Sequence, residues 1–232
     1  MKLAELAFAC YVYGQMTDYD DSYLDFLKRT SPHLDLRKEQ HRKALLDWLN
    51  DWGCRQFAID YHGLASEEIH SWYKDLGDGL FSLDKTLLEF SDDDFASAEV
   101  AYAKLVNITA SKRALRGGGE TTVQFGPTGT AKILFALRPN ALVPWDEPIR
   151  SNFHFVGSPD HYASYLRLVR ENLEELAEAC ASNGHRISGL PQLLGRPKSS
   201  LAKLIDEYFW VTVSRKCPAP TRNQLLQWTQ WV

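Results

Sequence analysis

Residues 125–150 read FGPTGTAKILFALRPNALVPWDEPIR, and this stretch decides how we interpret the chain. Gly126 and Gly129 bound a predicted turn, an apolar run predicts a short helix, and prolines mark the connection that follows it. Asp146 then stands where the next helix should begin. Glycines let a backbone approach another chain closely, and the start of a helix offers free amides. This turn is therefore a candidate phosphate-binding site.

Asp146 allows two interpretations. It precedes Glu147 and Pro148, which is an ordinary N-cap pattern with proline in the first helical turn, so capping alone would explain it. The alternative is that its carboxylate faces a substrate, and both can hold because a helix N-terminus fixes the position of such a group. A phosphate-binding turn beside one carboxylate is typical of an enzyme that acts on the sugar of a nucleic acid.

Composition excludes several classes of protein. The 232 residues are 44% hydrophobic and 12% aromatic, which is enough for a substantial core, and no segment has the ~20 apolar residues of a membrane span. Glu5 interrupts the short apolar N-terminal run, so we expect a core helix there and not a signal peptide. The cysteines lack the spacings of zinc or iron–sulfur sites, and we predict reduced thiols in a cytoplasmic protein: Cys10, Cys54, Cys180 and Cys217.

Charge is distributed unevenly along the chain. Residues 1–110 contain 20 acidic and 11 basic side chains, whereas residues 111–232 contain 10 acidic and 15 basic ones. A nucleic acid would therefore meet mainly the second half. The alternative is that basic helices simply complement acidic helices inside the fold.

The hydrophobic pattern is helical almost throughout. Residues 41–52 carry leucines and tryptophans at three- and four-residue spacing, and residues 159–182 carry a longer apolar stripe between a serine N-cap and a terminating glycine. Strand signals are short: residues 121–123 are β-branched, and residues 210–213 are better interpreted as a helix end.

One break interrupts this pattern, at residues 111–120, SKRALRGGGE. Three consecutive glycines disfavour a helix, so we predict a loop there. We expect an all-α fold with an acidic helical lobe of residues 1–110, a basic lobe of residues 111–232, and a groove between them. The two lobes could also form one compact domain.

Turn, helix, connection and capped aspartate together resemble the helix-hairpin-helix DNA glycosylase superfamily (HhH-GPD), which includes endonuclease III and the 8-oxoguanine glycosylases. In that family a hairpin of the type L-P-G-V-G is followed by a helix and then by V-D-x-x-V. Residues 125–129 stand for the hairpin with a Pro-Thr variation, and residues 143–149 stand for the aspartate segment. The resemblance is sharp over residues 125–150, and elsewhere it rests on general helical character.

The resemblance implies a helix-hairpin-helix motif, a DNA-binding groove between two helical lobes, and a target nucleotide flipped out of the duplex. It implies that Asp146 stabilises the oxocarbenium-like sugar as the base departs and orients a water molecule. No cofactor is implied apart from a monovalent cation on the hairpin carbonyls, and no metal. The candidate phosphate contacts are Gly126, Thr128, Gly129, Thr130 and Lys132.

Bifunctional members of this superfamily carry a lysine two residues after the last hairpin glycine, where it attacks the sugar as a Schiff-base nucleophile. Ala131 occupies that position here, and Lys132 follows it. One residue on a helix is a rotation of ~100°, so we expect Lys132 to point away from the site. We therefore predict a monofunctional enzyme. If the hairpin aligns one residue differently, Lys132 is the nucleophile.

Further candidates come from basic and aromatic side chains. Four basic residues could contact DNA, although those beside the glycines could also belong to a solvated linker: Lys112, Arg113, Arg116 and Arg150. Four aromatic residues could stack on a flipped base, although helical spacing favours a place in the core: Trp48, Trp52, Trp72 and Tyr73. The run of Asp92, Asp93 and Asp94 is interpreted as a charged helix start and not as a metal site.

The resemblance thus predicts a cytoplasmic, monomeric DNA glycosylase that excises a modified base from double-stranded DNA and leaves an abasic site. Its biological setting would be base-excision repair or defence against phage DNA with hypermodified cytosine. No association with a membrane is expected. The alternative is a non-catalytic helix-hairpin-helix DNA-binding module, which would produce no abasic sites.

Overall fold

The computed structural model describes residues 1–76 and 80–228, and this part of the chain is mostly helical, as predicted. The α-helices are α1 (Leu3–Met16), α2 (Tyr19–Arg29), α3 (Glu39–Asp51), α4 (His62–Leu76), α5 (Asp92–Val106), α6 (Gly126–Leu137), α7 (Glu147–Asn152), α8 (Pro159–Ser182), α9 (Leu190–Leu193), α10 (Leu201–Phe209) and α11 (Arg222–Trp228). Short 3-10 turns are η1 (Ile59–Tyr61), η2 (Leu87–Glu89) and η3 (Ile187–Gly189), and η4 (Trp210–Ser214) is a π-helical turn. Two strands, β1 (Thr109–Ala114) and β2 (Glu120–Gln124), form an antiparallel hairpin.

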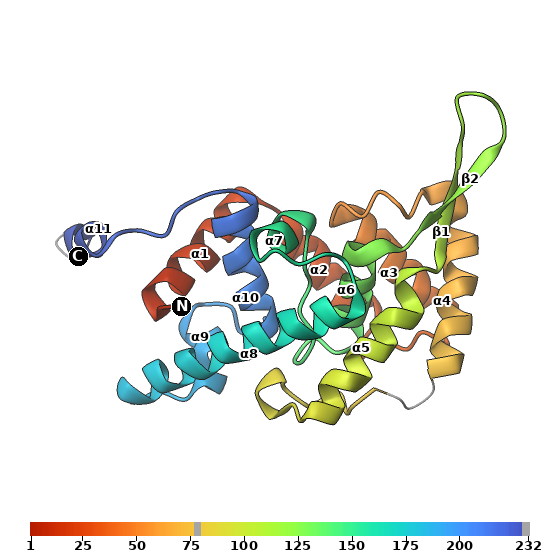
Figure 1. Cartoon of the computed structure of the whole chain (residues 1–232). Helices are drawn as coiled ribbons and strands as arrows, with labels where there is room; N and C mark the ends of the chain where they lie inside the picture. The colour runs from red at the N-terminus through yellow and green to blue at the C-terminus, as the bar shows by residue number, and fades with distance from the viewer. Residues whose placement is uncertain (77–79, 229–232) are drawn as a thin grey trace.

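Helix α6 lies at the centre of the molecule, with other helices packed around it (Figure 1). Its residues from Gly129 to Leu137 are all buried. Because the segment AKILFAL is apolar on every side of the helix apart from one lysine, it has no face that prefers solvent. Around it, α5 packs on α8, α1 packs on α10, and α2 packs on α3. One large hydrophobic cluster includes residues of both halves of the chain.

The longest predicted helix is confirmed. Helix α8 spans Pro159–Ser182, the range that the amphipathic stripe and its two end signals predict. The segment at residues 210–213 is confirmed as a helix end, since η4 continues α10 for one wider turn. The acidic run after Ser91 is a helix start: Asp94 accepts a hydrogen bond from the Ser91 amide at 2.7 Å and pairs with Lys85 at 2.6 Å.

The glycine-rich break differs from the prediction. It is the tip of the β1–β2 hairpin, with Lys112 opposite Thr122 and Ala114 opposite Glu120. Gly118 and Gly119 both have positive φ and turn the chain there, and the amide of Leu115 donates to the carbonyl of Gly119 at 3.0 Å. The prediction of a loop over residues 111–120 is therefore wrong for β1, whereas the strand signal at residues 121–123 is confirmed.

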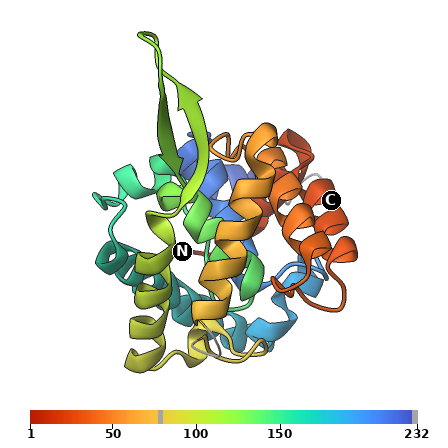
Figure 2. The ribbon, with the colours of Figure 1, turned by 90° about the vertical axis from the view of Figure 1, so that its right-hand side faces the viewer.

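This hairpin projects from the body beside α4 (Figures 1 and 2). It occupies the chain between α5 and α6, so residues 125–129 are not a tight turn between two helices. Phe125 caps α6, Gly126 is its first residue, and Gly129 lies inside it. The expected turn therefore differs from the observed strand-to-helix junction.

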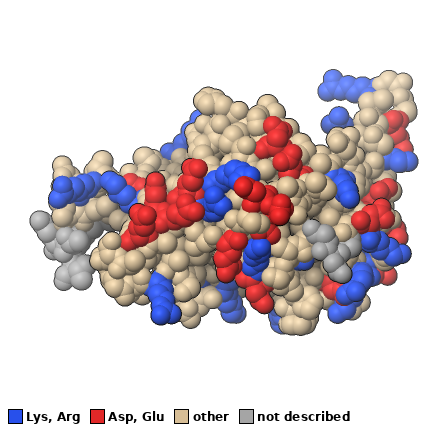
Figure 3. All heavy atoms as spheres, turned by 60° about the horizontal axis from the view of Figure 1, so that its bottom comes forward, with Lys and Arg blue, Asp and Glu red and all other residues tan. Residues whose placement is uncertain are grey.

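Acidic and basic side chains are interspersed on the face shown in Figure 3, and Lys and Arg side chains also stand on the projecting hairpin. Within the described ranges, no helix combines the length and apolarity that crossing a bilayer requires.

Candidate functional site

Lys132 and Asp146 form the centre of the candidate site. The Lys132 Nζ atom lies 3.2 Å from Asp146 Oδ1 and donates a hydrogen bond to the Trp52 carbonyl at 2.8 Å. The expectation that Lys132 points away from Asp146 is wrong: the Ala131 side chain is wholly buried in the core, and the long Lys132 side chain brings its ammonium to the carboxylate. Since Lys132 is only 6% exposed and its Nζ is engaged, it does not present a contact for a DNA phosphate.

The Asp146 carboxylate is not explained by capping. The Asp146 backbone stands at the N-cap of α7, yet among the described residues its side chain accepts no capping hydrogen bond. Its side chain is 28% exposed and turns to Lys132 instead. Of the two interpretations of this aspartate, the geometry favours a carboxylate that faces a shared space.

The segment that precedes Asp146 is held in place by contacts with aromatic residues. The hydroxyls of Tyr162 and Tyr165 on α8 donate to the carbonyls of Val143 and Pro144 at 3.1 and 3.2 Å. The Trp145 ring is completely buried between Tyr102 and Tyr162. These contacts hold the backbone before Asp146 in place and so fix where its side chain can reach.

A small cavity of about 40 Å³ contains this pair. Its walls come from α1, the start of α2, the end of α3, α6, the start of α7, α10 and η4, and are formed by Tyr13, Tyr19, Trp52, Lys132, Asp146, Asp206 and Trp210. A cavity of this size has room for a few water molecules. A base could enter only after side chains of the wall move.

The aromatic walls were only partly foreseen. Trp52 lines the cavity, whereas Trp48 is buried in the core. Tyr19 lies 6.3 Å from the Trp52 ring and 5.9 Å from the Trp210 ring, measured between centroids. Tyr13 meets Trp210 edge to face at 5.2 Å. These rings give the cavity surfaces on which a planar group could stack.

Asp206 is a functional candidate that the sequence analysis missed. It lies on α10, is 8% exposed and lines the cavity. Burial raises the pKa of its carboxyl to about 7; nearby Lys203 and Lys132 oppose that rise, and Asp146 adds to it. The signal in the sequence is weak, because an Asp-Glu pair inside the apolar run LIDEYFWV also fits an exposed helix edge.

The two lysines of this region remain charged. Burial lowers the pKa of Lys132, but attraction by Cys54, Asp146 and Asp206 raises it by more, and the pKa lies above its ordinary value. The same balance, with Glu207 as the strongest attracting partner, raises the pKa of Lys203. The site therefore combines fixed positive charge with two carboxyl groups.

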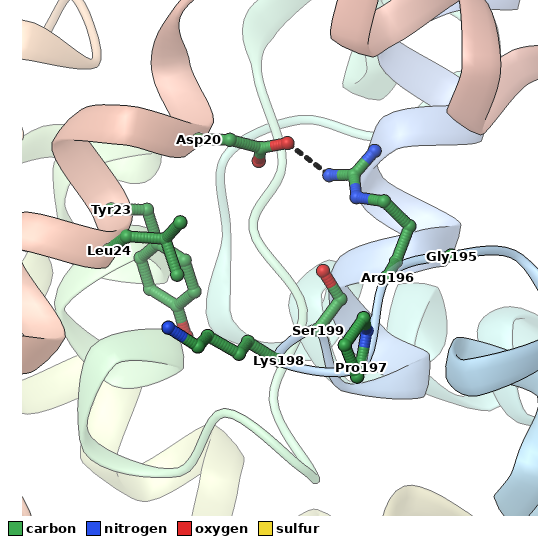
Figure 4. Close-up of a pocket in the computed structure, with 8 residues that line it drawn as sticks. All are labelled: Asp20, Tyr23, Leu24, Gly195, Arg196, Pro197, Lys198 and Ser199. Atoms are coloured by element: carbon green, nitrogen blue, oxygen red, sulfur yellow. Dashed lines mark hydrogen bonds and ion pairs between the residues drawn. The ribbon is translucent and has the colours of Figure 1, made fainter.

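A buried ion network supports α10 from behind. Lys203 is completely buried and lies 2.9 Å from Glu207 and 3.3 Å from Asp20. Arg196 contacts both Glu207, at 2.7 Å, and Asp20. The Asp20–Arg196 contact spans a second hollow of about 200 Å³ between α2 and the loop before α10 (Figure 4). This network joins α10 to α2 and thereby positions Asp206 against the rest of the cavity.

The predicted phosphate contacts at the start of α6 are mostly covered. Gly129 and Thr130 are buried, and a Cβ atom at Gly129 would lie 2.5 Å from Gln56 Nε2 and 2.9 Å from the Phe57 ring. Their assignment as phosphate contacts is therefore wrong in this conformation. Gly126 and Thr128 remain partly exposed.

Arg150 is also unavailable as a DNA contact. It is 9% exposed, its Nη1 donates to Thr128 Oγ1 at 2.9 Å, and its guanidinium lies over the Trp145 ring. By contrast, the basic residues of the hairpin are exposed, and among the described residues the Lys112 ammonium has one ion pair, of 3.8 Å, with Glu120. Trp72 and Tyr73 lie on α4 and are not among the cavity residues.

Comparison of the chain with known protein families, with curated proteins and with solved structures finds no match.

Proposed function

We propose that this protein is a monofunctional DNA glycosylase that removes a modified base and leaves an abasic site. The observation that carries the proposal is the Lys132–Asp146 pair in an aromatic-walled cavity, with the Asp146 carboxylate released from capping. Cleavage of a glycosidic bond builds positive charge on the sugar, and a fixed carboxylate lowers the energy of that state.

In this proposal the two members of the pair have different tasks. Asp146 stabilises the sugar cation and orients the water that adds to it. Lys132 holds the carboxylate in one position through a contact of 3.2 Å, while its second contact, to the Trp52 carbonyl, prevents it from moving with the substrate. Positioning of this kind matters because a shift of about 1 Å at a reacting group can lower a rate 10²-fold.

The cavity must open before a base can stack in it. Tyr19 and Trp210 stand at its wall, and Trp210 begins the π-helical turn η4. Turns of this kind are frequent at functional sites and are less regular than the α-helix that precedes them. We therefore assign Tyr19 and Trp210 as the residues that part when the nucleotide enters.

Acidic residues beside Tyr19 would repel the DNA backbone from one side of the opening between Tyr19 and Trp210. A hollow of about 310 Å³ beside Tyr19 is lined by Asp18, Asp21, Ser22 and Asp51. Carboxylates there repel phosphates, whereas Lys112, Arg113 and Arg116 on the projecting hairpin attract them. In this proposal the flipped nucleotide reaches the cavity while the duplex backbone lies along the hairpin side, in a groove between the two halves of the chain.

In this proposal Lys132 does not attack the sugar and forms no covalent bond with the DNA. An amine must lose its proton before it attacks a sugar, and the pKa of Lys132 is raised above its ordinary value by Cys54, Asp146 and Asp206 against the opposing effect of burial. Strands should therefore stay intact until treated with alkali, and borohydride should trap no protein–DNA adduct. An adduct that disappears in Lys132→Ala would identify Lys132 as the nucleophile and replace the monofunctional assignment.

The decisive experiment is an assay for abasic sites. The protein is incubated with duplexes that each carry one modified or mismatched base, including glucosylated hydroxymethylcytosine, in buffer with EDTA. Release of a free base together with alkali-labile strands is the expected result. Binding to the same duplexes without any alkali-labile product would identify a non-catalytic DNA-binding module instead.

A further inference from the structure

Asp206 and Asp146 share the cavity but have different surroundings. Asp146 is paired with Lys132 at 3.2 Å. Asp206 also lines the cavity, and its carboxyl makes no side-chain hydrogen bond or ion pair with another residue in the described part of the chain. A buried carboxylate without a partner is costly, so such a group either keeps its proton or meets a partner that is not part of the protein.

Charged and titratable groups face Asp206 from several elements. Lys203 and Glu207 lie on its own helix, Lys132 comes from α6, and Asp146 precedes α7. Tyr13 on α1 and Tyr165 on α8 also interact with its charge. Burial is the largest influence on the pKa of Asp206, which lies at about 7. Near neutral pH a large fraction of Asp206 is thus protonated, while the Asp146 carboxylate lies 3.2 Å from the Lys132 ammonium.

We propose that Asp206 is the proton donor to the departing base, an assignment that rests on the proposed glycosylase function. Two carboxyl groups in one site, one neutral and one ionised, can divide the work of acid and charge stabiliser. The placement of both groups around one cavity, with only Asp146 held by a cation, gives each a distinct role.

Atoms and electrons balance in this step. The bond between C1′ of the sugar and the base nitrogen breaks, and its electron pair goes to the base, which takes the proton of the Asp206 carboxyl. The sugar cation is stabilised by Asp146 until water adds to C1′. The proton that water loses passes to the Asp206 carboxylate and restores it. The products are a free base and a sugar hemiacetal.

This assignment limits the class of base that the site removes. An uncharged base is a poor leaving group and gains from protonation as it departs. A base that already carries a positive charge, such as N7-methylguanine, needs no proton from the protein. We therefore infer that the site is built for uncharged modified bases.

The test measures single-turnover base release between pH 5 and 9 on the uncharged base that the wild-type protein removes. The wild-type rate should fall as the pH rises through about 7, the value to which burial brings the pKa of Asp206. Asp206→Asn should lose about 10²–10⁴-fold in rate and should lose this pH dependence. Asp206→Glu, which keeps a carboxyl, should retain it. Asp75→Asn, a change of an exposed carboxylate on α4 outside the cavity, should behave like the wild type.

The possible outcomes separate the two proposals. A wild-type rate that is flat from pH 6 to 9, or an Asp206→Asn rate within threefold of the wild type, overturns the role of Asp206 and leaves the glycosylase proposal standing. The wild-type profile decides the question even if Asp206→Asn does not fold. If the wild-type protein releases no base from any duplex, the proposed function itself fails, and the role of Asp206 fails with it.

Discussion

Lys132 and Asp146 form an ion pair of 3.2 Å in which the lysine is almost wholly buried and the aspartate remains open to a cavity. The asymmetry is informative. A buried ion pair is weak evidence for stability, since desolvation offsets much of the attraction. The Asp146 side chain stays 28% exposed beside the fixed Lys132 ammonium. This exposure is more simply explained by a role in contacting a molecule that enters the cavity.

Asp146→Asn should abolish base release and leave binding of duplex DNA intact. The amide keeps the shape of the side chain but cannot balance the charge that develops on the sugar. We expect a loss of at least about 10²–10³-fold in rate, as for the removal of other groups that stabilise transition-state charge. Glu147→Gln is the matched control, because Glu147 is the next residue, is exposed, and contacts only Ser151 at 2.6 Å among the described residues. Equal rates for both variants and the wild type would remove Asp146 from the mechanism.

Lys132→Met should lower the free energy of unfolding by about 1–3 kcal/mol, because it leaves the buried Trp52 carbonyl without its donor and Asp146 without its partner. Methionine preserves most of the apolar stem. Denaturant titration measures the loss, with Lys104→Met on the exposed face of α5 as the control that should change stability by less than about 0.5 kcal/mol. A variant as stable as the wild type would show that these contacts do not form.

Gly129→Val should destabilise the fold, by about 1–3 kcal/mol if the core gives way locally. The reason is steric, since a Cβ at this position would lie 2.5 Å from Gln56 Nε2 and 2.9 Å from Phe57. Gly63→Ala is the matched control: Gly63 lies near the start of α4 with nothing within 4 Å of its added Cβ, so the change should be neutral or slightly stabilising. If Gly129→Val melts like the wild type and weakens only DNA binding, Gly129 contacts phosphate after all.

Replacing Lys112, Arg113 and Arg116 together with Gln should weaken binding to duplex DNA of any sequence. It should also reduce the slope of log affinity against log salt by about 0.9 for each phosphate that the variant no longer neutralises. A control with the same change in net charge replaces three exposed basic residues outside the hairpin: Lys74, Lys104 and Arg186. Similar salt slopes in both triple variants would mean that DNA does not meet the hairpin.

The stability of the protein should depend on pH through Asp206. Its pKa is about 7 in the folded state against an ordinary 3.8, so the folded state holds this proton more tightly than the unfolded state does. The contribution is complete below pH 4 and is lost as the pH rises to about 7, at about 1.4 kcal/mol for each unit. The difference in unfolding free energy between Asp206→Asn and the wild type should therefore shift in favour of the variant over that interval. A constant difference from pH 4 to 8 would contradict the raised pKa.

Sequence reasoning predicted the parts of the fold that follow from local pattern. Helix α8 was predictable because one face is apolar, a serine at the N-cap position marks its start, and a glycine marks its end. Helix α6 was harder, because it is buried all round and has no polar face to set its phase. The orientation of Lys132 was predicted wrongly because a rotation of ~100° from Ala131 takes no account of the reach of the long lysine side chain. Strand β1 has the sequence TASKRA, in which only Thr109 is β-branched, so pairing with β2 and not intrinsic preference makes it a strand.

Only part of the candidate site was predictable: Asp146, Trp52 and Lys132 were named from the sequence, although Lys132 was given another role. Asp146 could be found because proline and tryptophan mark its place along the chain. Tyr13, Trp210 and Asp206 become part of the site only when α1 and α10 pack together, and nothing in their spacing shows this. Asp206 illustrates the difficulty best. The two nearby lysines are paired with other carboxylates, Lys132 with Asp146 and Lys203 with Glu207 and Asp20, and the sequence does not show these pairings.

The β1–β2 hairpin also has a consequence for how this architecture can vary. It leaves and rejoins the helical body at neighbouring points, because the Phe125 amide donates to the Ile108 carbonyl at 2.8 Å and closes its base. The base of the hairpin is anchored, since Ser111 is buried and donates to the Gln56 carbonyl at 2.7 Å, whereas residues 112–120 are exposed. The length, tip and charge of this exposed part can therefore change without displacing α5, α6 or the cavity. Under the proposed function, selection for new nucleic-acid targets acts on this exposed part of the hairpin and leaves the residues of the cavity unchanged.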